Sequence, residues 1–206
     1  SDDDAVAAGL DRAVDDLAAV IEASNEPRVA LLGISGAAPI AIAYATRHPQ
    51  RVSHLGLLGG YLCGLTHREP SAQTQAFFEA QLQLMEQGWG RNHPAVQQFF
   101  TTTLAPDASP EMARALNELQ RLACNGRQAA QFMRTRAALD VRALAPHVAC
   151  PCLVLHVEGD LVVHHGELRF QLHETVAQVV ESGQTALQRG GHGALHPPPR
   201  DLVADL

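Results

Sequence analysis

The chain has 206 residues, of which 46% are hydrophobic and 18% are charged, so it can bury a core and is not a disordered tail. Its net charge of −7 argues against nucleic acid as a main partner, because phosphate binding needs clustered cations. The apolar runs are far shorter than the roughly 20 residues of a membrane span. The acidic start Ser1-Asp2-Asp3-Asp4 lacks the basic residues of an export signal. We therefore expect a cytoplasmic protein of one domain, or of a domain with a subdomain, that does not bind membranes.

The cysteines and histidines do not indicate metal or redox chemistry. Four cysteines are too few for a disulfide scaffold in a chain of this length. Cys150 and Cys152 are separated by one residue rather than two, and we expect them to be buried thiols at the start of a strand. His164 and His165 are adjacent, so they point in different directions and make a poor ligand pair. No metal is predicted.

Helix and strand patterns alternate at the beginning of the chain. Apolar residues at helical spacing predict a helix from about Asp11 to Ser24. The segment Val29–Leu32 is apolar on both faces, which is typical of a strand inside a parallel sheet. A glycine-rich turn leads to an alanine-rich helix expected at about 37–47, and a strand is expected over Val52–Leu58.

The pattern changes between about residues 66 and 141. Strand signals stop, and glycines and prolines separate four amphipathic helical stretches, expected near 71–88, 93–104, 109–123 and 127–138. A strand is then expected over Cys152–Val157, followed by a helix from about Gly166 to Glu181 and a short strand over Thr185–Gln188. This order predicts an α/β fold with a helical excursion in its middle.

Three polar residues, Ser35, Asp160 and His192, each follow a predicted strand. The carboxyl ends of parallel strands share one edge of the sheet, where ligands bind. A serine hydroxyl becomes a nucleophile when a histidine takes its proton, and an acid behind the histidine fixes the tautomer of the ring. His196 and the His164-His165 pair are alternatives for the base, but the glycines beside His192 favour a tight loop that aims its ring at the site.

These motifs resemble those of the α/β-hydrolase superfamily. The segment Gly33-Ile34-Ser35-Gly36-Ala37 is similar to its nucleophile elbow. The segment Pro151–His156, which leads to Gly159-Asp160, is similar to its acid-bearing strand, and Gly191-His192 to its histidine loop. Other stretches, including Gly59-Gly60-Tyr61, resemble a bacterial group whose members often stand beside, or are fused to, transcriptional regulators and cyclase-type signalling domains.

The resemblance implies an α/β-hydrolase fold, with a mostly parallel sheet, flanking helices and a helical cap inserted in the middle. Residues 1–63 would form the first part of the core, 64–146 the cap and 147–206 the second part of the core. A complete member has further strands before the elbow, so we expect an N-terminally truncated core whose elbow strand is an open sheet edge. Such an edge invites pairing with another chain, and a second copy of this one is a candidate.

The resemblance also implies a serine hydrolase that acts on a carboxylic ester or related small acyl compound through an acyl-enzyme, without a cofactor. Ser35 would attack the carbonyl carbon, His192 would shuttle the proton and Asp160 would orient His192. The backbone N–H of Gly36 would hold one side of the oxyanion.

The substrate pocket is expected to be lined by Ile34, Trp89 and Val162. Trp89 belongs to a set of aromatic and methionine side chains in the helical stretches, which form either the core of the insert or its pocket-facing surface. An alternative of a different class is a non-catalytic ligand-binding or regulatory domain derived from an α/β hydrolase, which the regulator-associated relatives suggest.

Overall fold

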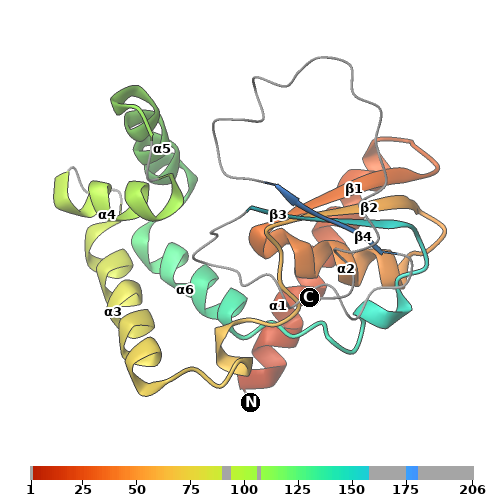
Figure 1. The fold of residues 1–206 in the computed structure, drawn as a ribbon, viewed down its shortest axis with the longest axis horizontal. Coiled ribbons are helices and arrows are strands. Elements are labelled where there is room, and N and C mark those ends of the chain that lie inside the picture. The colour runs from red at the N-terminus through yellow and green to blue at the C-terminus, as the bar shows by residue number, and fades with distance from the viewer. Residues whose placement is uncertain (1, 90–93, 106–107, 158–174, 181–206) are drawn as a thin grey trace.

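The computed structural model describes residues 2–89, 94–105, 108–157 and 175–180. A four-stranded sheet runs through it (Figure 1), in the order β1 (Val29–Ile34), β2 (Val52–Leu58), β3 (Cys152–Val157) and β4 (Thr175–Val180). Each neighbouring pair of strands is parallel. The carboxyl ends of all four strands therefore lie at the same edge of the sheet.

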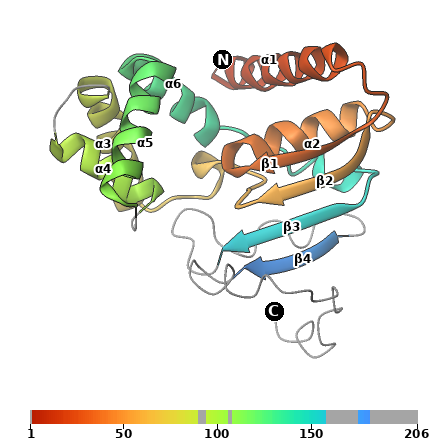
Figure 2. The ribbon, with the colours of Figure 1, turned by 90° about the horizontal axis from the view of Figure 1, so that it is seen from above.

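Two helices cover one face of this sheet (Figure 2): α1 (Asp2–Ala23) and α2 (Ala38–Arg47). In α1, Val14 and Ile21 of the predicted apolar stripe are buried, and Leu10, which precedes the predicted start of the helix, is buried with them. The small side chains of α2 allow it to be buried on almost every side between α1 and the strands.

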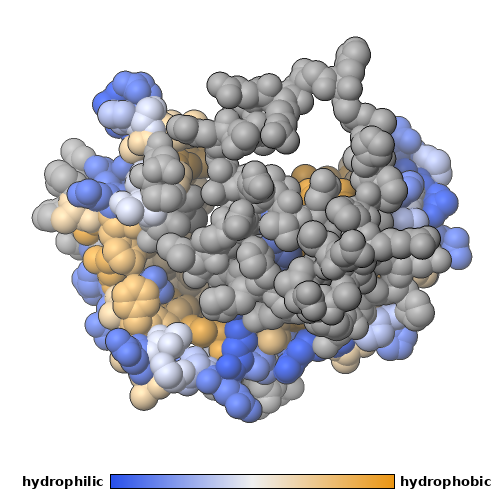
Figure 3. All heavy atoms as spheres, in the orientation of Figure 1, coloured by the Kyte–Doolittle hydropathy of each residue, from blue (hydrophilic) through white to orange (hydrophobic). Residues whose placement is uncertain are grey.

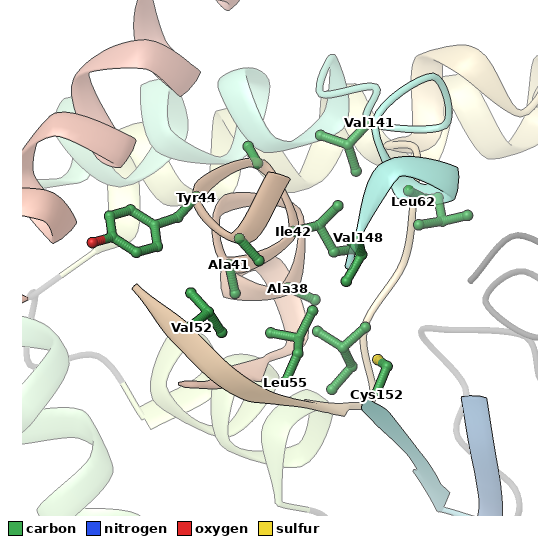
Figure 4. Packing of buried hydrophobic residues seen from close by; sticks show 14 of the residues in the cluster. Ala38, Ala41, Ile42, Tyr44, Val52, Leu55, Leu62, Val141, Val148 and Cys152 are labelled. Atoms are coloured by element: carbon green, nitrogen blue, oxygen red, sulfur yellow. The ribbon is translucent and has the colours of Figure 1, made fainter. Parts of the chain in front are cut away.

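The main core lies between α2 and the sheet, where the labelled residues of both meet (Figure 4). Ile42 of α2 is 0% exposed and Leu55 of β2 is 1% exposed. Val141 and Val148, from the segment that leads into β3, close the same cluster. Each fully buried side chain of this kind stabilises the fold by about 1.5–3 kcal/mol.

Between β2 and β3 the chain forms four helices, which we call the helical insertion: α3 (Ala72–Gly88), α4 (Pro94–Leu104), α5 (Pro110–Ala123) and α6 (Gly126–Ala137). Their bounds lie within one residue of the predicted ones. Side-chain N-caps at Ser71, Ser109 and Asn125 satisfy the free N–H groups at the starts of α3, α5 and α6. The strand arrows in Figure 2 point toward the insertion, which therefore lies at the carboxyl edge of the sheet.

The two ends of the insertion are joined in a stem, formed by residues 62–67 and 137–141. The Gly64 N–H donates to the carbonyl of Leu139 at 2.7 Å, and the Thr66 hydroxyl donates to the carbonyl of Ala137 at 2.8 Å. A Cβ on Gly64 would lie 2.3 Å from the carbonyl oxygens of both Arg136 and Ala137. The stem thus depends on a glycine and fixes the end of α6 against the core.

The strand β1 is at the end of the sheet within the described residues, since it pairs only with β2. Leu32 is 60% exposed and Ile34 is 53% exposed. The apolar composition of this strand is typical of a sheet interior, whereas here one of its faces and one of its edges are open.

The prediction of a helix from about Gly166 to Glu181 is wrong where the structure describes that segment. Residues 175–180 form β4, which pairs in parallel with all six residues of β3. Four of its residues (Thr175, Val176, Val179 and Val180) are β-branched and favour a strand beside an available edge. The strand predicted at 185–188 lies outside the described residues.

No helix in the ranges given above is both long and apolar enough to cross a lipid bilayer.

Candidate active site

Ser35 lies at the carboxyl edge of the sheet, in the turn between β1 and α2. The strand ends at Ile34, and a single 3₁₀ turn, Ser35–Ala37, leads directly into the helix. Ser35 has a φ of 50°, in the left-handed region that side chains other than glycine rarely adopt. This conformation costs roughly 1–2 kcal/mol, which the packing of β1 and α2 must supply.

Gly33 permits the close approach of strand and helix on which this turn depends. A Cβ at position 33 would lie 2.8 Å from the Cα of Ala38 and 3.1 Å from the Cβ of Ala41. Any side chain there would push α2 away from β1 and open the turn. Ala37, at the last position of the predicted elbow motif, is exposed and meets no such restriction.

Arg136, from the last turn of α6, reaches across to this turn. Its Nη2 donates to the Oγ of Ser35 at 3.1 Å, and its Nε donates to the hydroxyl of Tyr61 at 3.2 Å. A Cβ on Gly36 would lie 2.0 Å from the Arg136 Nε, so the guanidinium occupies the space beside Gly36 that a side chain would fill. Sequence reasoning did not identify Arg136, because it is 101 residues from Ser35 and no local motif marks it.

Aromatic rings surround the Arg136 guanidinium. Its Cζ lies 5.9 Å from the ring centroid of Tyr61 and 5.5 Å from that of Phe132. A second arginine, Arg68, has its Cζ 5.2 Å from the Tyr61 ring and donates from Nε to the carbonyl of Cys63 at 2.9 Å. Two arginines therefore contact the ring of Tyr61, and one of them, Arg136, also reaches Ser35.

The other predicted catalytic residues, Asp160 and His192, lie outside the described residues, as does Val162 of the predicted pocket. The strand that precedes Asp160 is nevertheless described: β3 ends at Val157, and only β2 separates it from β1. Neighbouring strands are about 4.8 Å apart, so the ends of β1 and β3 are about 10 Å apart.

Ile34 and Trp89 belong to the described residues but lie in different parts of the structure. Ile34 is the last residue of β1, directly before Ser35. Trp89 follows α3, and its Nε1 donates to the carbonyls of Gln120 and Cys124, each at 3.0 Å. The Trp89 ring also meets Phe100 edge-on at 5.1 Å between centroids. These contacts join helices of the insertion, and the pocket role of Trp89 stays a prediction.

The cysteines are free thiols, and Cys63, Cys150 and Cys152 are buried. This confirms the prediction of buried thiols at the start of a strand, since β3 begins at Cys152. Burial raises the pKa of Cys152 to about 12 and also raises that of Cys150. No group of three or more metal-ligating side chains gathers within the described ranges.

A family comparison agrees with this architecture. The model of the alpha/beta hydrolase fold family matches residues 7–182. The chain belongs to this family. A search of curated proteins found no match to the sequence.

Solved structures of an esterase, an enol-lactonase and a putative lipase are similar to this one. The esterase from Exiguobacterium antarcticum has 20% identity and a TM-score of 0.66, with 81% of this chain and 63% of that chain covered. The enol-lactonase from Burkholderia xenovorans LB400 has 17% identity, a TM-score of 0.64, and coverage of 84% and 64%. A putative lipase from Acinetobacter baumannii AYE has 16% identity, a TM-score of 0.62, and coverage of 84% and 59%. The matches span less than two thirds of the length of these three proteins.

Proposed function

We propose that this α/β hydrolase is a serine hydrolase that cleaves a carboxylic ester or a related acyl compound. The observation that carries the proposal is the backbone of Ser35. Its φ of 50° at a sharp strand-to-helix turn is the geometry that presents a serine Oγ at the top of a parallel sheet. Asn25 and Glu69 have similar φ values, but neither directly follows a strand of the sheet as Ser35 does, so the position of Ser35 supports its role as the nucleophile.

The reaction proceeds by two acyl transfers. Ser35 Oγ attacks the carbonyl carbon while His192 takes the hydroxyl proton, and the carbonyl π electrons move to the oxygen. The tetrahedral intermediate collapses, the bond to the leaving oxygen breaks, and that oxygen receives the proton from His192. Water then attacks the acyl-serine with the same base, which releases the carboxylic acid and restores Ser35.

Asp160 would orient His192 and stabilise its protonated ring, and the Gly36 N–H would donate to the developing oxyanion. The separation of about 10 Å between the ends of β1 and β3 supports the triad, because it leaves room for one imidazole between a serine and an acid. The helical insertion would act as a cap, residues 64–146, between core segments 1–63 and 147–206. Its position at the carboxyl edge of the sheet supports this role.

The similar structures include an esterase and an enol-lactonase, and both of those reactions transfer an acyl group. Their likeness in fold makes acyl compounds the first substrate class to test. Among these, an oxygen ester of a short acid is the simplest substrate, since it requires no further cofactor.

The experiment is hydrolysis of short and medium p-nitrophenyl esters by the wild type and by Ser35→Ala, with Ser24→Ala at the end of α1 as the control. We expect Ser35→Ala to lose at least about 10³-fold in kcat/KM and Ser24→Ala to retain the wild-type value. His192→Ala should behave like Ser35→Ala, whereas His196→Ala should not. Full activity in Ser35→Ala would overturn the proposal.

A fluorophosphonate probe separates the proposal from the ligand-binding alternative. A competent nucleophile becomes covalently labelled at Ser35, and the label is absent from Ser35→Ala. A folded protein that hydrolyses none of the esters and takes no label would instead favour a non-catalytic ligand-binding or regulatory domain.

A further inference from the structure

The charge on Arg136 has no acidic partner within the described part of the chain. Five other arginines there form ion pairs with nearby carboxylates: Arg47, Arg114, Arg121, Arg134 and Arg142. Arg134, two residues before Arg136 on the same helix, pairs with Glu86 at 2.8 Å. Arg136 instead contacts a serine hydroxyl, a tyrosine hydroxyl and two rings, all of them neutral.

The guanidinium is also held in position before any ligand arrives. Its Nε is bonded to the hydroxyl of Tyr61, whose side chain is buried, with only 6% of the residue exposed. The stem fixes the backbone of α6 one residue further on, through the bond from Thr66 to the carbonyl of Ala137. A guanidinium has five N–H donors; here Nε donates to Tyr61 and Nη2 donates to Ser35, so the guanidinium is positioned with Nη2 at the nucleophile.

A partly buried cation without a counter-ion is costly, and a carboxylate is the group whose two oxygens match the fork of a guanidinium. The Nη2 atom is 3.1 Å from Ser35 Oγ. The attacked carbon must come into bonding distance of the same Oγ, so a substrate group that touches this guanidinium is only a few bonds from that carbon. A half-ester of a short dicarboxylic acid has this arrangement.

We propose that Arg136 selects acyl substrates that carry a carboxylate a few bonds from the scissile carbonyl. The inference rests on the proposed function, and it names the substrate class of the same site. The carboxylate replaces the neutral contacts of the Arg136 Nη atoms with charge-assisted hydrogen bonds, and Ser35 Oγ is released to react. Arg136 is a specificity-determining residue in this scheme.

Two esters of matched shape test the proposal: mono-p-nitrophenyl succinate and p-nitrophenyl butyrate, in which a methyl group replaces the carboxylate. We expect the wild type to have the higher kcat/KM for the succinyl ester. Arg136→Met retains an unbranched side chain against the rings but removes the charge. It should lower kcat/KM for the succinyl ester by about 10- to 100-fold and change that for the butyryl ester by less than about threefold.

Arg134→Met is the matched control, because it removes a neighbouring arginine that is paired with Glu86 and does not touch Ser35. It should leave the ratio of the two kcat/KM values unchanged. Arg136→Lys keeps the charge without the fork and should lie between wild type and Arg136→Met. An equal loss of kcat/KM for both esters in Arg136→Met would overturn the proposal, because the arginine would then act on the nucleophile. An equal gain for both esters would also overturn it, because the arginine would then only block the site.

A binding measurement separates failure of this proposal from failure of the proposed function. Ser35→Ala, which cannot turn over, is titrated calorimetrically with mono-methyl succinate and with methyl butyrate, in which a smaller, neutral methyl group replaces the carboxylate. We expect the anionic ester to have the lower Kd. Adding the substitution Arg136→Met should reduce the ratio of the two Kd values at least tenfold. This result stands even if no ester is hydrolysed. Hydrolysis without any preference for the anionic ester overturns the role of Arg136 alone.

Discussion

At the scale of single residues, the turn at Ser35 combines a strained backbone conformation with close packing between the strand and the helix on either side of it. Ser35 has a φ of 50°, and the approach of α2 to Gly33 leaves the chain little room to relax. Positive φ is disfavoured for every residue with a Cβ, because the side chain crowds the following carbonyl. The turn therefore keeps the Ser35 side chain at some expense of stability.

We expect Ser35→Gly to be more stable than Ser35→Ala by about 1 kcal/mol, since both lose the hydroxyl but only glycine tolerates this φ. Urea unfolding measures the difference. At Ala30, which is exposed in the extended strand β1, alanine should instead be more stable than glycine. Ala30→Gly should therefore lower the free energy of unfolding by about 0.5–1 kcal/mol. Equal stability of the two variants at position 35 would mean that the turn carries no strain.

The sequence could predict the turn at Ser35 but not the contact that Arg136 makes with it. Ser35 lies in a short motif between an apolar strand and a small-residue helix, so its neighbours define it. Arg136 is one of several arginines in a helical segment, and its contact with Ser35 depends on how the insertion folds back over the sheet. The packing of a stem and four helices decides that contact, and no local periodicity expresses it.

At the scale of elements, the helical insertion is attached to the core through a narrow stem. The N–H of Val141 donates to the carbonyl of Leu62 at 2.8 Å, and Cys63 pairs with Asp140 in an antiparallel bridge. Gly64 lies against backbone atoms of α6, which cannot move aside as a flexible side chain can. The position of Arg136 relative to Ser35 therefore depends on Gly64.

We expect Gly64→Ala to lower the free energy of unfolding by about 1–3 kcal/mol, because its Cβ would overlap the carbonyls of Arg136 and Ala137. It should also weaken the preference for the anionic ester by displacing α6. Thermal and urea unfolding measure the first effect. The control is Gly56→Ala, whose Cβ would lie 3.1 Å from the end of the exposed Leu32 side chain and at an ordinary contact distance of 3.7 Å from the carbonyl oxygen of Leu31. A smaller loss in Gly64→Ala than in Gly56→Ala would contradict this account of the stem.

The elements that the sequence predicted well are those with clear ends. Gly88, Pro94, Pro110 and Gly126 separate the helices of the insertion, and each lies at an observed helix boundary. The segment around β4 has no such punctuation, and its apolar residues fit a helix as well as a strand. The edge of β3 decided between the two, since pairing with it satisfies the backbone hydrogen bonds of residues 175–180.

At the scale of the whole molecule, apolar surface is distributed unevenly. The core between α2 and the sheet is tightly closed, whereas large apolar side chains are exposed on the insertion, among them Phe77, Met112, Leu119, Leu122 and Phe132. Figure 3 shows hydrophobic surface on this side of the molecule. The main core should therefore resist solvent and reagents until the whole domain unfolds.

The reactivity of the four thiols measures this difference between the closed core and the more exposed insertion. In the folded protein at pH 8, we expect a thiol reagent such as Ellman's reagent to modify Cys124 rapidly, since it is only partly buried. Cys63, Cys150 and Cys152 should react at the rate of unfolding, and the pKa of about 12 at Cys152 also suppresses its thiolate. Cys124→Ser should remove the fast phase. Fast modification of Cys150 or Cys152, which belong to the main core, would contradict the closed core.

The space beside Gly36 has a consequence for how this protein can change over generations. The three atoms nearest to a Cβ at position 36 all belong to the flexible end of Arg136, so we expect the fold to survive the substitution while the guanidinium loses its place. Once a side chain occupied position 36, Arg136 would already have lost its place beside Ser35, so substituting Arg136 would have little further effect. Restoring the present arrangement would then require glycine at position 36 first and arginine at position 136 second. Positions 36 and 136 are therefore expected to be epistatic, with the glycine as the permissive partner.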